Sequence, residues 1–441
     1  MVVDHYDTFV SGYQTRYGET HGRLRTEAEN AFLNFRRCGD PNFGVTLFRC
    51  DTCDVKLGVP FTCKARICPS CLSRKADTRA SHLSEVLPRV EHRHIVFGLP
   101  KKMGLRQRIQ EDPKLLRKVT RLVNQTIAEH LVSCVIVHRH RRDELKKARP
   151  GIIVAQHTWA DNLDFHPHLH LCISDGVFTT DGDFYAALDW KPEELKEKLR
   201  RRILKAFVRW EKLTPEAADI VACWELDKCG FSLFIGSPIA EDDRERLARL
   251  LRYLMRSPVS FKRLKYDERT GKVTMRLKRD QVKVFDHAVD FLAALARHVP
   301  RARQQTVTYA GHYANATGNL SLKKDEAEQK DELEVPVQPG GRRYVPWNLL
   351  VLRCWAVDPE LCPRCGERME RDKPVYKQPA LSQLLKSLRV GKYPQRPPPA
   401  PPPQTQAASN HDSEYSNAQQ FGDNVVQLFP DDNFNQVPPG W

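Results

Sequence analysis

The chain has 441 residues, enough for two or three domains, and 41 % of them are hydrophobic, an ordinary share for a globular protein. No run of about 18 apolar residues occurs and the first residues do not resemble a secretory signal, so we expect no membrane span and a cytoplasmic location. Lys and Arg outnumber Asp and Glu by 70 to 55, and the net charge of +15 favours a polyanionic partner, nucleic acid first. Thirteen cysteines in such a chain indicate metal ligands or free thiols rather than disulfides.

Six of the cysteines lie between residues 38 and 71 and include two C-x2-C knuckles. Cys50 and Cys53 form the first knuckle, and Cys68 and Cys71 form the second after fourteen intervening residues. Each knuckle lets two thiolates reach one ion from a tight turn, and two knuckles complete a tetrahedral zinc site. The spacing therefore predicts one structural zinc ion on these four cysteines.

Two further cysteines and several cations surround the knuckles. Cys38 and Cys63 do not belong to either knuckle. They could be buried thiols, alternative zinc ligands, or half of a second metal site with a residue such as His21. Lys64 and Arg66 lie beside the second knuckle, where they are either phosphate contacts on a rigid loop or ordinary surface charges.

The next 200 residues mix strand and helix patterns. Alternating and β-branched runs predict two strands, and amphipathic periods predict three helices. These elements are expected at residues 93–99 (strand), 113–127 (helix), 151–159 (strand), 192–212 (helix) and 240–256 (helix). A hairpin is expected around Thr270-Gly271. The mixture predicts an α+β domain.

Residues 164–174 predict a further strand with a metal-binding face. Side chains of a strand alternate, so His166, His168, His170 and Cys172 share one face and the intervening apolar residues pack on the other. Two imidazoles at i and i+2 are well placed to share a divalent metal ion. The sequence leaves a third ligand open, and the candidates are Gln156, His157, Asp161 and Asp164.

The predicted helix at 240–256 offers a nucleophile. Its apolar stripe is Leu247, Leu250, Leu251 and Leu254. Beside that stripe, Tyr253 falls among Arg246, Arg249 and Arg256, which predicts a helical tyrosine rather than a core aromatic. A tyrosine hydroxyl can attack a phosphodiester to give a covalent phosphotyrosine, while arginines hold the phosphate and lower the pKa of the phenol. Tyr309, Tyr313 and Tyr266 are alternative nucleophiles that the pattern favours less.

The C-terminal third contains a linker, a small module and a tail. A charge run and Pro339-Gly-Gly341 predict a linker, and a single knuckle, Cys362 and Cys365, follows with no second knuckle after it, so zinc there would need Cys354 or a distant ligand. A Pro-rich tail completes the chain. The domain prediction is a zinc-binding DNA-recognition module at 1–88, a nuclease domain at 89–322, a linker at 323–341, a small module at 342–393 and a disordered tail at 394–441.

The motifs resemble the rolling-circle transposases of the insertion-sequence-ninety-one family, members of the HUH single-strand endonuclease superfamily. The zinc module of that family carries C-G, C-x2-C and S-C-K-x-R-x-C-P-x-C, which match Cys38-Gly39, Cys50 to Cys53 and residues 62–71. Its first nuclease strand, H-x-V-F-T-L-P, matches residues 94–100, with Gly98 in place of Thr. Its metal motif, H-P-H-L-H, matches residues 166–170. The resemblance extends over residues 10 to 370.

The resemblance implies metal-dependent nicking and transfer of single-stranded DNA, with His168 and His170 on Mg or Mn and Tyr253 as the nucleophile. Two-tyrosine members carry a tyrosine four residues earlier, where this chain has Arg249, so the resemblance is to the single-tyrosine branch. Either Tyr253 is reused, or a second subunit of a homodimer supplies another tyrosine. The alternatives are a replication initiator or relaxase with the same chemistry, and a zinc-dependent DNA-binding protein with an inactive nuclease.

Overall fold

The computed structural model describes residues 1–135, 142–314 and 360–388. The predicted linker at 323–341 and tail at 394–441 lie outside these residues. The described part combines an antiparallel sheet with flanking helices, so the predicted α+β class is confirmed. Among the described helices, none has the combined length and apolarity that a membrane crossing requires.

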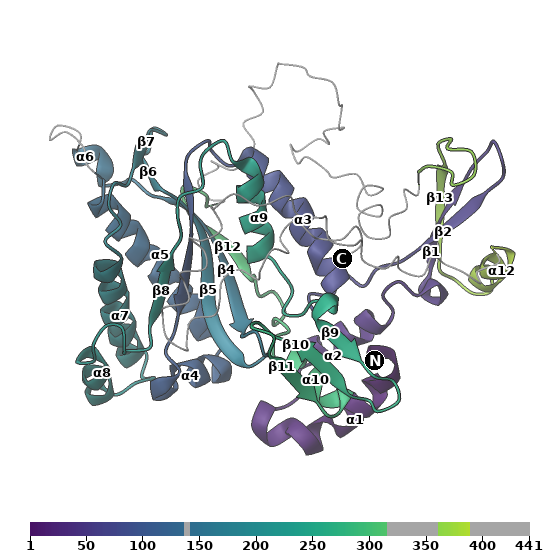
Figure 1. The fold of residues 1–441 in the computed structure, drawn as a ribbon, viewed down its shortest axis with the longest axis horizontal. Helices are drawn as coiled ribbons and strands as arrows, with labels where there is room; N and C mark the ends of the chain where they lie inside the picture. The colour runs from purple at the N-terminus through teal and green to yellow at the C-terminus, as the bar shows by residue number, and fades with distance from the viewer. Residues whose placement is uncertain (136–141, 315–359, 389–441) are drawn as a thin grey trace.

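The centre of the molecule is a five-stranded sheet in the order β12-β4-β5-β3-β8, with every neighbouring pair antiparallel (Figure 1). Its strands are β3 (His92–Gly98), β4 (Gly151–Trp159), β5 (Phe165–Ser174), β8 (Ser232–Ile235) and β12 (Val307–Gly311). The strands predicted at 93–99, 151–159 and within 164–174 are therefore confirmed. Strand β5 lies in the middle of the sheet, so both of its edges are paired.

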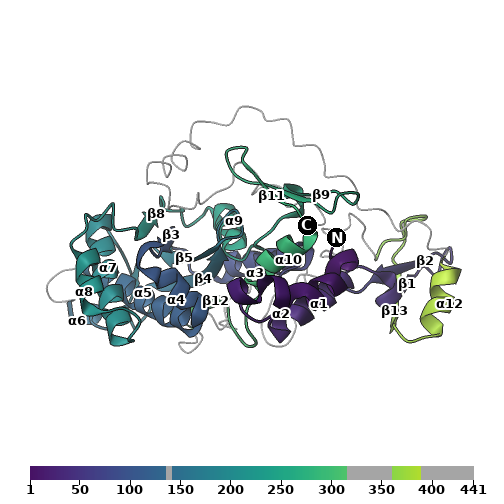
Figure 2. The same cartoon turned by 90° about the horizontal axis from the view of Figure 1, so that it is seen from below.

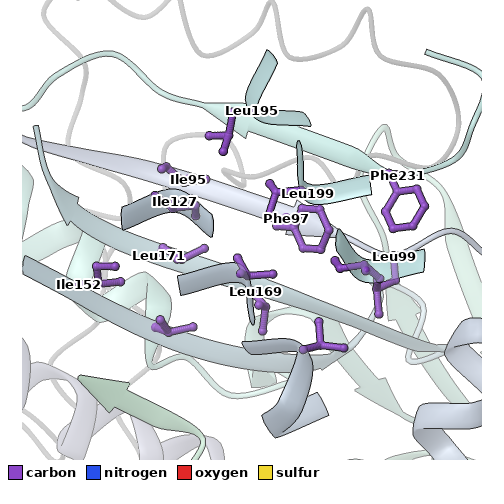
Figure 3. Packing of buried hydrophobic residues seen from close by; sticks show 14 of the residues in the cluster. Ile95, Phe97, Leu99, Ile127, Ile152, Leu169, Leu171, Leu195, Leu199 and Phe231 are labelled. Carbon is purple, nitrogen blue, oxygen red and sulfur yellow. The ribbon is translucent and has the colours of Figure 1, made fainter. Parts of the chain in front are cut away.

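One face of the sheet is apolar and packs against four helices. These are α4 (Leu105–Glu111), α5 (Lys114–Ser133), α7 (Pro192–Arg209) and α8 (Pro215–Ala222). Leu169 and Leu171 of β5 belong to this core with Ile127 of α5 and Leu199 of α7, as Figure 3 shows. Each fully buried Leu or Ile contributes about 1.5–3 kcal/mol. A slip of β5 by one residue would place its imidazoles in this core, so the core fixes which side the histidines face.

The opposite face is covered by α3 (Pro69–Val86) and α9 (Arg244–Leu254). Asp243 begins α9 by accepting a hydrogen bond from the backbone N–H of Arg246 at 2.9 Å. Arg252 of α9 forms an ion pair with Asp77 of α3, with 3.0 Å between nitrogen and oxygen. The predicted leucine stripe of α9 is buried as expected.

A second hydrophobic core combines the first two helices of the chain, from the predicted zinc module, with elements near the end of the predicted nuclease domain. It contains α1 (Val2–His21), α2 (Thr26–Arg36), α10 (Ala288–Ala296) and the small sheet of β9 (Leu264–Tyr266), β10 (Val273–Arg276) and β11 (Val282–Phe285). The hairpin expected around Thr270-Gly271 is the β9–β10 connection, and Gly271 has the positive φ of 71° that the turn requires. Because the first helices pack on α10, the boundary predicted at residue 88 does not separate two cores.

A third, smaller sheet lies at the end of the molecule remote from α7 and α8 (Figure 2). It consists of β1 (Val45–Arg49), β2 (Lys56–Pro60) and β13 (Glu370–Val375) in the order β13-β1-β2, with α12 (Ala380–Ser387) nearby. Strand β13, which falls within the small module predicted at 342–393, pairs with β1 and completes a sheet that begins at residue 45. The remaining short elements are η1 (Pro41–Phe43), η2 (Lys102–Gly104), α6 (Arg142–Leu145), β6 (Gly176–Phe178), β7 (Phe184–Ala186) and η4 (Phe261–Arg263).

Candidate active site and metal centres

Three buried imidazoles meet on the face of the five-stranded sheet that α3 and α9 cover. The register of β4 and β5 places His157 directly opposite His168, and His170 follows two residues along the same face. One ring nitrogen of each residue lies within 4.8 Å of those of the other two. The Nε2 atoms of His168 and His170 are 3.1 Å apart.

The second nitrogen of each imidazole is engaged outside the cluster. His168 Nδ1 donates to the carbonyl oxygen of His166 at 2.7 Å, and His157 Nε2 donates to that of Leu254 at 2.9 Å. These carbonyls accept only, so each ring carries its proton on the outer nitrogen and turns a lone pair inward. The inward Nδ1 of His157 is buried and has no hydrogen-bond partner. This is the arrangement of metal-ligating histidines, whose outer nitrogens are held by carbonyls, so the three residues fit a divalent ion.

Burial keeps these imidazoles neutral. It lowers the pKa of His168 to about 4 and those of His157 and His170 well below the ordinary value. Arg256 acts in the same direction on all three, and neighbouring histidines do so on His157 and His170. A neutral imidazole is the form that binds metal, so the site is ready for an ion at neutral pH.

Of the four candidates for the third ligand, the structure brings only His157 into the cluster. Gln156 points to the opposite face and donates to Thr120 Oγ1 at 2.9 Å. Asp161 pairs with Arg263 at 2.5 Å, and Asp164 lies 3.3 Å from Lys283 Nζ, so both carboxylates face cations of the neighbouring small sheet. His166 lies outside the group, and its backbone carbonyl holds His168.

His94, for which no role is predicted from the sequence, lies behind His170. Its Nε2 lies 3.1 Å from His170 Nδ1, and both residues are fully or almost fully buried. It therefore holds the outer nitrogen of the third imidazole in place, although a ring nitrogen, unlike a carbonyl, can either donate or accept. The alternation of β3 could have shown that His94 faces the same side as the histidines of β5, once β3 and β5 were known to pair.

Tyr253 lies directly over the histidines, at the end of α9. Its ring centroid is 5.1 Å from that of His170 and 6.0 Å from that of His94, both in edge-on contact. The guanidinium of Arg256 lies over the Tyr253 ring, 4.3 Å from its centroid. Tyr253 and the metal motif, which the sequence predicts to act together, therefore lie side by side although Tyr253 and His170 are 83 residues apart in the chain.

Two details of that prediction are wrong. Tyr253 is only 2 % exposed and packs in a core with leucines of α9, because the end of this helix is pressed onto the sheet. Burial raises the pKa of its phenol, and Arg256 opposes this rise without reversing it. The neighbouring arginines therefore do not give the lowered pKa that the sequence analysis predicted.

The alternative tyrosines lie elsewhere. The Tyr309 hydroxyl accepts a hydrogen bond from Arg79 Nε at 2.9 Å, and the Tyr313 hydroxyl is 2.7 Å from His92 Nε2 in a buried pair. The hydroxyl of Tyr266, in β9, lies 2.7 Å from Nε2 of His5, in α1. The partners of these three tyrosines lie outside the imidazole cluster, so Tyr253 is the tyrosine that the described structure places against it.

A cleft of about 1710 Å³ opens beside the imidazoles, and His157, His166 and Arg256 form part of its lining. Four acidic residues line it, against twelve cations: Arg23, Arg25, Arg66, Lys75, Arg79, Lys101, Arg106, Arg256, Lys278, Arg279, Arg297 and Arg301. Trp159, Phe165 and Tyr309 add aromatic surface. A groove of this charge with aromatic side chains suits the backbone and bases of a single strand.

Of the five residues predicted from the sequence to contact DNA, two line this cleft and three do not. Arg66 and Arg256 line it. Lys64 is exposed and is not part of the lining, and Arg246 and Arg249 of α9 are half-buried and also lie outside it. Arg249 pairs with Glu245 at 2.8 Å, and Arg246 donates to the carbonyl of Pro238 at 3.5 Å. The structure therefore does not support a common phosphate-holding role for the arginines of this helix.

The cysteines form two clusters rather than the predicted one. The Sγ atoms of Cys38 and Cys63 each lie 3.6 Å from that of Cys71, and Cys68 completes the first cluster. The second cluster joins the remaining N-terminal knuckle to the C-terminal one and consists of Cys50, Cys53, Cys362 and Cys365. The two N-terminal knuckles do not share an ion site, because β1 and β2 turn the first knuckle away from the start of α3. His21 belongs to neither cluster and stacks on Tyr17.

Comparison with known proteins gives a consistent result over most of the chain. Residues 7–99 match the family profile described as "Transposase zinc-binding domain", and residues 151–320 match one described as "Putative transposase". The chain is 26 % identical to the transposase for insertion sequence element IS801 of Pseudomonas savastanoi pv. phaseolicola, over 79 % of this chain and 84 % of that protein. It is 27 % identical to the putative transposase y4qJ of Sinorhizobium fredii, over 68 % of this chain and 79 % of that protein. No protein of solved structure matches the chain.

Proposed function

Because the chain belongs to the insertion-sequence-ninety-one family of transposases, we propose that it cuts and rejoins single-stranded DNA through Tyr253. The observation that carries this proposal is the contact between Tyr253 and the imidazole cluster, with ring centroids of Tyr253 and His170 5.1 Å apart. Of the three imidazoles, His157 lines the cationic cleft, and Arg256, which also lines it, lies over the Tyr253 ring. A phosphate drawn into the cleft would therefore lie next to the cluster and the tyrosine. The two family profiles and both relatives favour a transposase over a replication initiator or a DNA-binding regulator.

His157, His168 and His170 would hold the divalent ion, which when bound polarises a phosphate oxygen and stabilises the charge that develops during transfer. A set of three imidazoles favours Mn²⁺ over Mg²⁺, because Mg²⁺ prefers oxygen ligands and keeps its water. The carbonyl of Leu254, which follows Tyr253 in the chain, accepts the outer hydrogen bond of His157. The nucleophile and the ligand set are therefore fixed to each other by the backbone.

The chemistry of the first step is an in-line displacement at phosphorus. The Tyr253 oxygen forms a bond to phosphorus as its proton leaves, and the bond from phosphorus to the 3′ oxygen breaks, releasing a 3′-hydroxyl after that oxygen takes up a proton. The reverse step, with a 3′-hydroxyl of another strand as the nucleophile, restores the tyrosine and joins the strands. Because burial raises the pKa of the phenol, Tyr253 is protonated at neutral pH, and the proton must leave as the phosphate approaches.

The lining of the cleft supports single-stranded DNA as the partner. Arg256 contacts both the cleft and the Tyr253 ring, so it is the cation best placed to hold the reacting phosphate. Trp159 stacks on His157 at 4.4 Å between centroids and offers a surface for a base next to that phosphate.

The test is incubation of the full chain with single-stranded oligonucleotides from the element's ends and either Mn²⁺ or Mg²⁺. We expect a covalent protein–DNA product from the wild type, none from Tyr253→Phe, and unchanged oligonucleotide binding by that variant. Tyr266→Phe is the matched control and should give the product in full. His168→Ala with His170→Ala should remove metal-dependent cleavage. Covalent product from Tyr253→Phe would refute the proposal.

A further inference from the structure

The second cysteine cluster lies at the far end of the small sheet that contains β1, β2 and β13, and the nuclease chemistry does not use it. Cys53 Sγ lies 3.6 Å from Cys50 Sγ, 3.3 Å from Cys362 Sγ and 3.6 Å from Cys365 Sγ, and Cys50 Sγ is 3.5 Å from Cys365 Sγ. Four thiolates around one zinc ion, at about 2.3 Å each, lie roughly 3.8 Å apart. The four sulfurs thus already have the spacing of a tetrahedral zinc site.

Disulfides do not explain this arrangement. A disulfide joins two sulfurs at about 2.05 Å, and here every measured separation exceeds 3 Å, with Cys53 close to three other sulfurs at once. A cluster of four mutually close thiols is instead what one shared ion requires.

The backbone around the C-terminal pair is shaped as a zinc knuckle. The N–H of Gly366 donates to the carbonyl of Cys362 at 2.9 Å, and the N–H of Arg364 lies 3.5 Å from Cys362 Sγ. Gly366 has a φ of 76°, which closes the turn. Amide donors aimed at a cysteine sulfur stabilise its thiolate, the form that binds metal.

The apolar core around this cluster is too small to hold the sheet. Besides Cys50 and Cys362, its buried members are only Phe48, Val59 and Met369 among the described residues. Most side chains of β13 are exposed, although its backbone pairs with β1 from Val45–Val375 to Arg49–Glu370. Small modules of this kind depend on a metal for their stability.

We propose that Cys50, Cys53, Cys362 and Cys365 bind a second structural zinc ion, separate from the one on the Cys38 cluster. Its ligands come from two knuckles separated by 309 residues in the chain, as Cys53 and Cys362 show. The ion therefore fastens the segment around β13 to the N-terminal module and completes the β13-β1-β2 sheet. The Cys50–Cys53 knuckle and the Cys362–Cys365 knuckle would thus each supply two of the four ligands of this site.

The test is the zinc content of the full chain, measured by mass spectrometry of the metal after removal of free ions under reducing conditions. It is done in a His168→Ala, His170→Ala background, so that the imidazole site does not contribute. We expect two zinc ions per chain, falling to one in Cys362→Ser with Cys365→Ser. Cys223→Ser, an exposed cysteine outside both clusters, is the matched control and should retain two.

Hydrogen exchange provides the second measurement. In the double-serine variant, the amides of β1 should exchange faster because β13 is released, while those of β4 and β5 keep their protection. One zinc ion per chain before the cysteines are changed, or two ions after they are changed, would overturn the proposal. Unaltered exchange in β1 would refute the fastening of β13 even if the zinc were lost.

Discussion

His94→Phe tests whether the outer hydrogen bonds prepare the imidazole cluster for metal. The phenyl ring fills the buried space between His170 and Phe234, whose ring is 6.2 Å from that of His94, but removes the nitrogen 3.1 Å from His170 Nδ1. His170 then loses the contact that fixes its ring, and losses of this kind weaken metal binding by about 10- to 100-fold. This corresponds to about 1.4–2.7 kcal/mol. Titration of Mn²⁺, followed by the electron paramagnetic resonance of the free ion, measures the change.

The matched control is His92→Phe, two residues earlier on the same strand. His92 is equally buried, but its nitrogens contact Tyr313 and the carbonyl of Val90 rather than the cluster. Its replacement should leave Mn²⁺ affinity unchanged. Wild-type affinity in His94→Phe, or an equal loss in both variants, would refute the assignment of His94 as a positioning residue.

Three other predictions concern stability, zinc and DNA affinity. Burial lowers the pKa of His92 from 6.5 to about 4, so unfolding takes up a proton between these pH values and stability falls as the pH drops through them. Between pH 7 and pH 4 the unfolding free energy of His92→Phe should therefore fall less than that of the wild type, by at most about 3 kcal/mol, and parallel curves in urea titrations would contradict this. Cys68→Ser should remove one zinc ion and weaken recognition of the DNA end without altering the nicking chemistry, whereas unchanged zinc content would show that Cys68 is not a ligand. Arg66→Ala should weaken binding of single-stranded DNA and reduce its salt dependence by about 0.7 per phosphate contact, while Arg249→Ala, outside the cleft lining, should not; equal effects would argue against the cleft as the DNA path.

The sequence was sufficient to predict features that depend on one element at a time. The period of two along β5 placed His168 and His170 on one face, and the helical period of α9 identified its buried leucines. Both are consequences of local geometry and of one apolar core. The third imidazole could not be chosen, because the selection of His157 over Gln156 depends on the register between β4 and β5.

Features that depend on distant parts of the chain were missed or misassigned. The grouping of the cysteines failed because pairing by sequence proximity joined knuckles that β1 and β2 separate, while the true partner of Cys53 lies 309 residues away. The exposure of Tyr253 was misjudged because the helical wheel placed it at the edge of the stripe. Only the packing of the end of α9 onto His170 shows that the phenol is buried.

The single tyrosine of α9 also bears on how donor and target strands are cut. Arg249 lies one turn before Tyr253, where a second nucleophile would stand, and it pairs with Glu245. In the proposed reaction, strand transfer requires Tyr253 to act twice or a second subunit to supply its own Tyr253. Mixing wild-type subunits with Tyr253→Phe subunits distinguishes these routes. Strand transfer that falls in proportion to the wild-type share would indicate a reused Tyr253, whereas a fall with the square of that share would indicate that two subunits each supply one.

The most direct test of the proposed chemistry is identification of the residue that carries the DNA. After reaction with a single-stranded element end and Mn²⁺, the protein is digested and the nucleotide-linked peptide is sequenced by mass spectrometry. We expect the linkage on Tyr253, in the peptide from the end of α9. A linkage on Tyr309, Tyr313 or Tyr266, or cleavage without any linked peptide, would contradict a site built from Tyr253 and the three imidazoles.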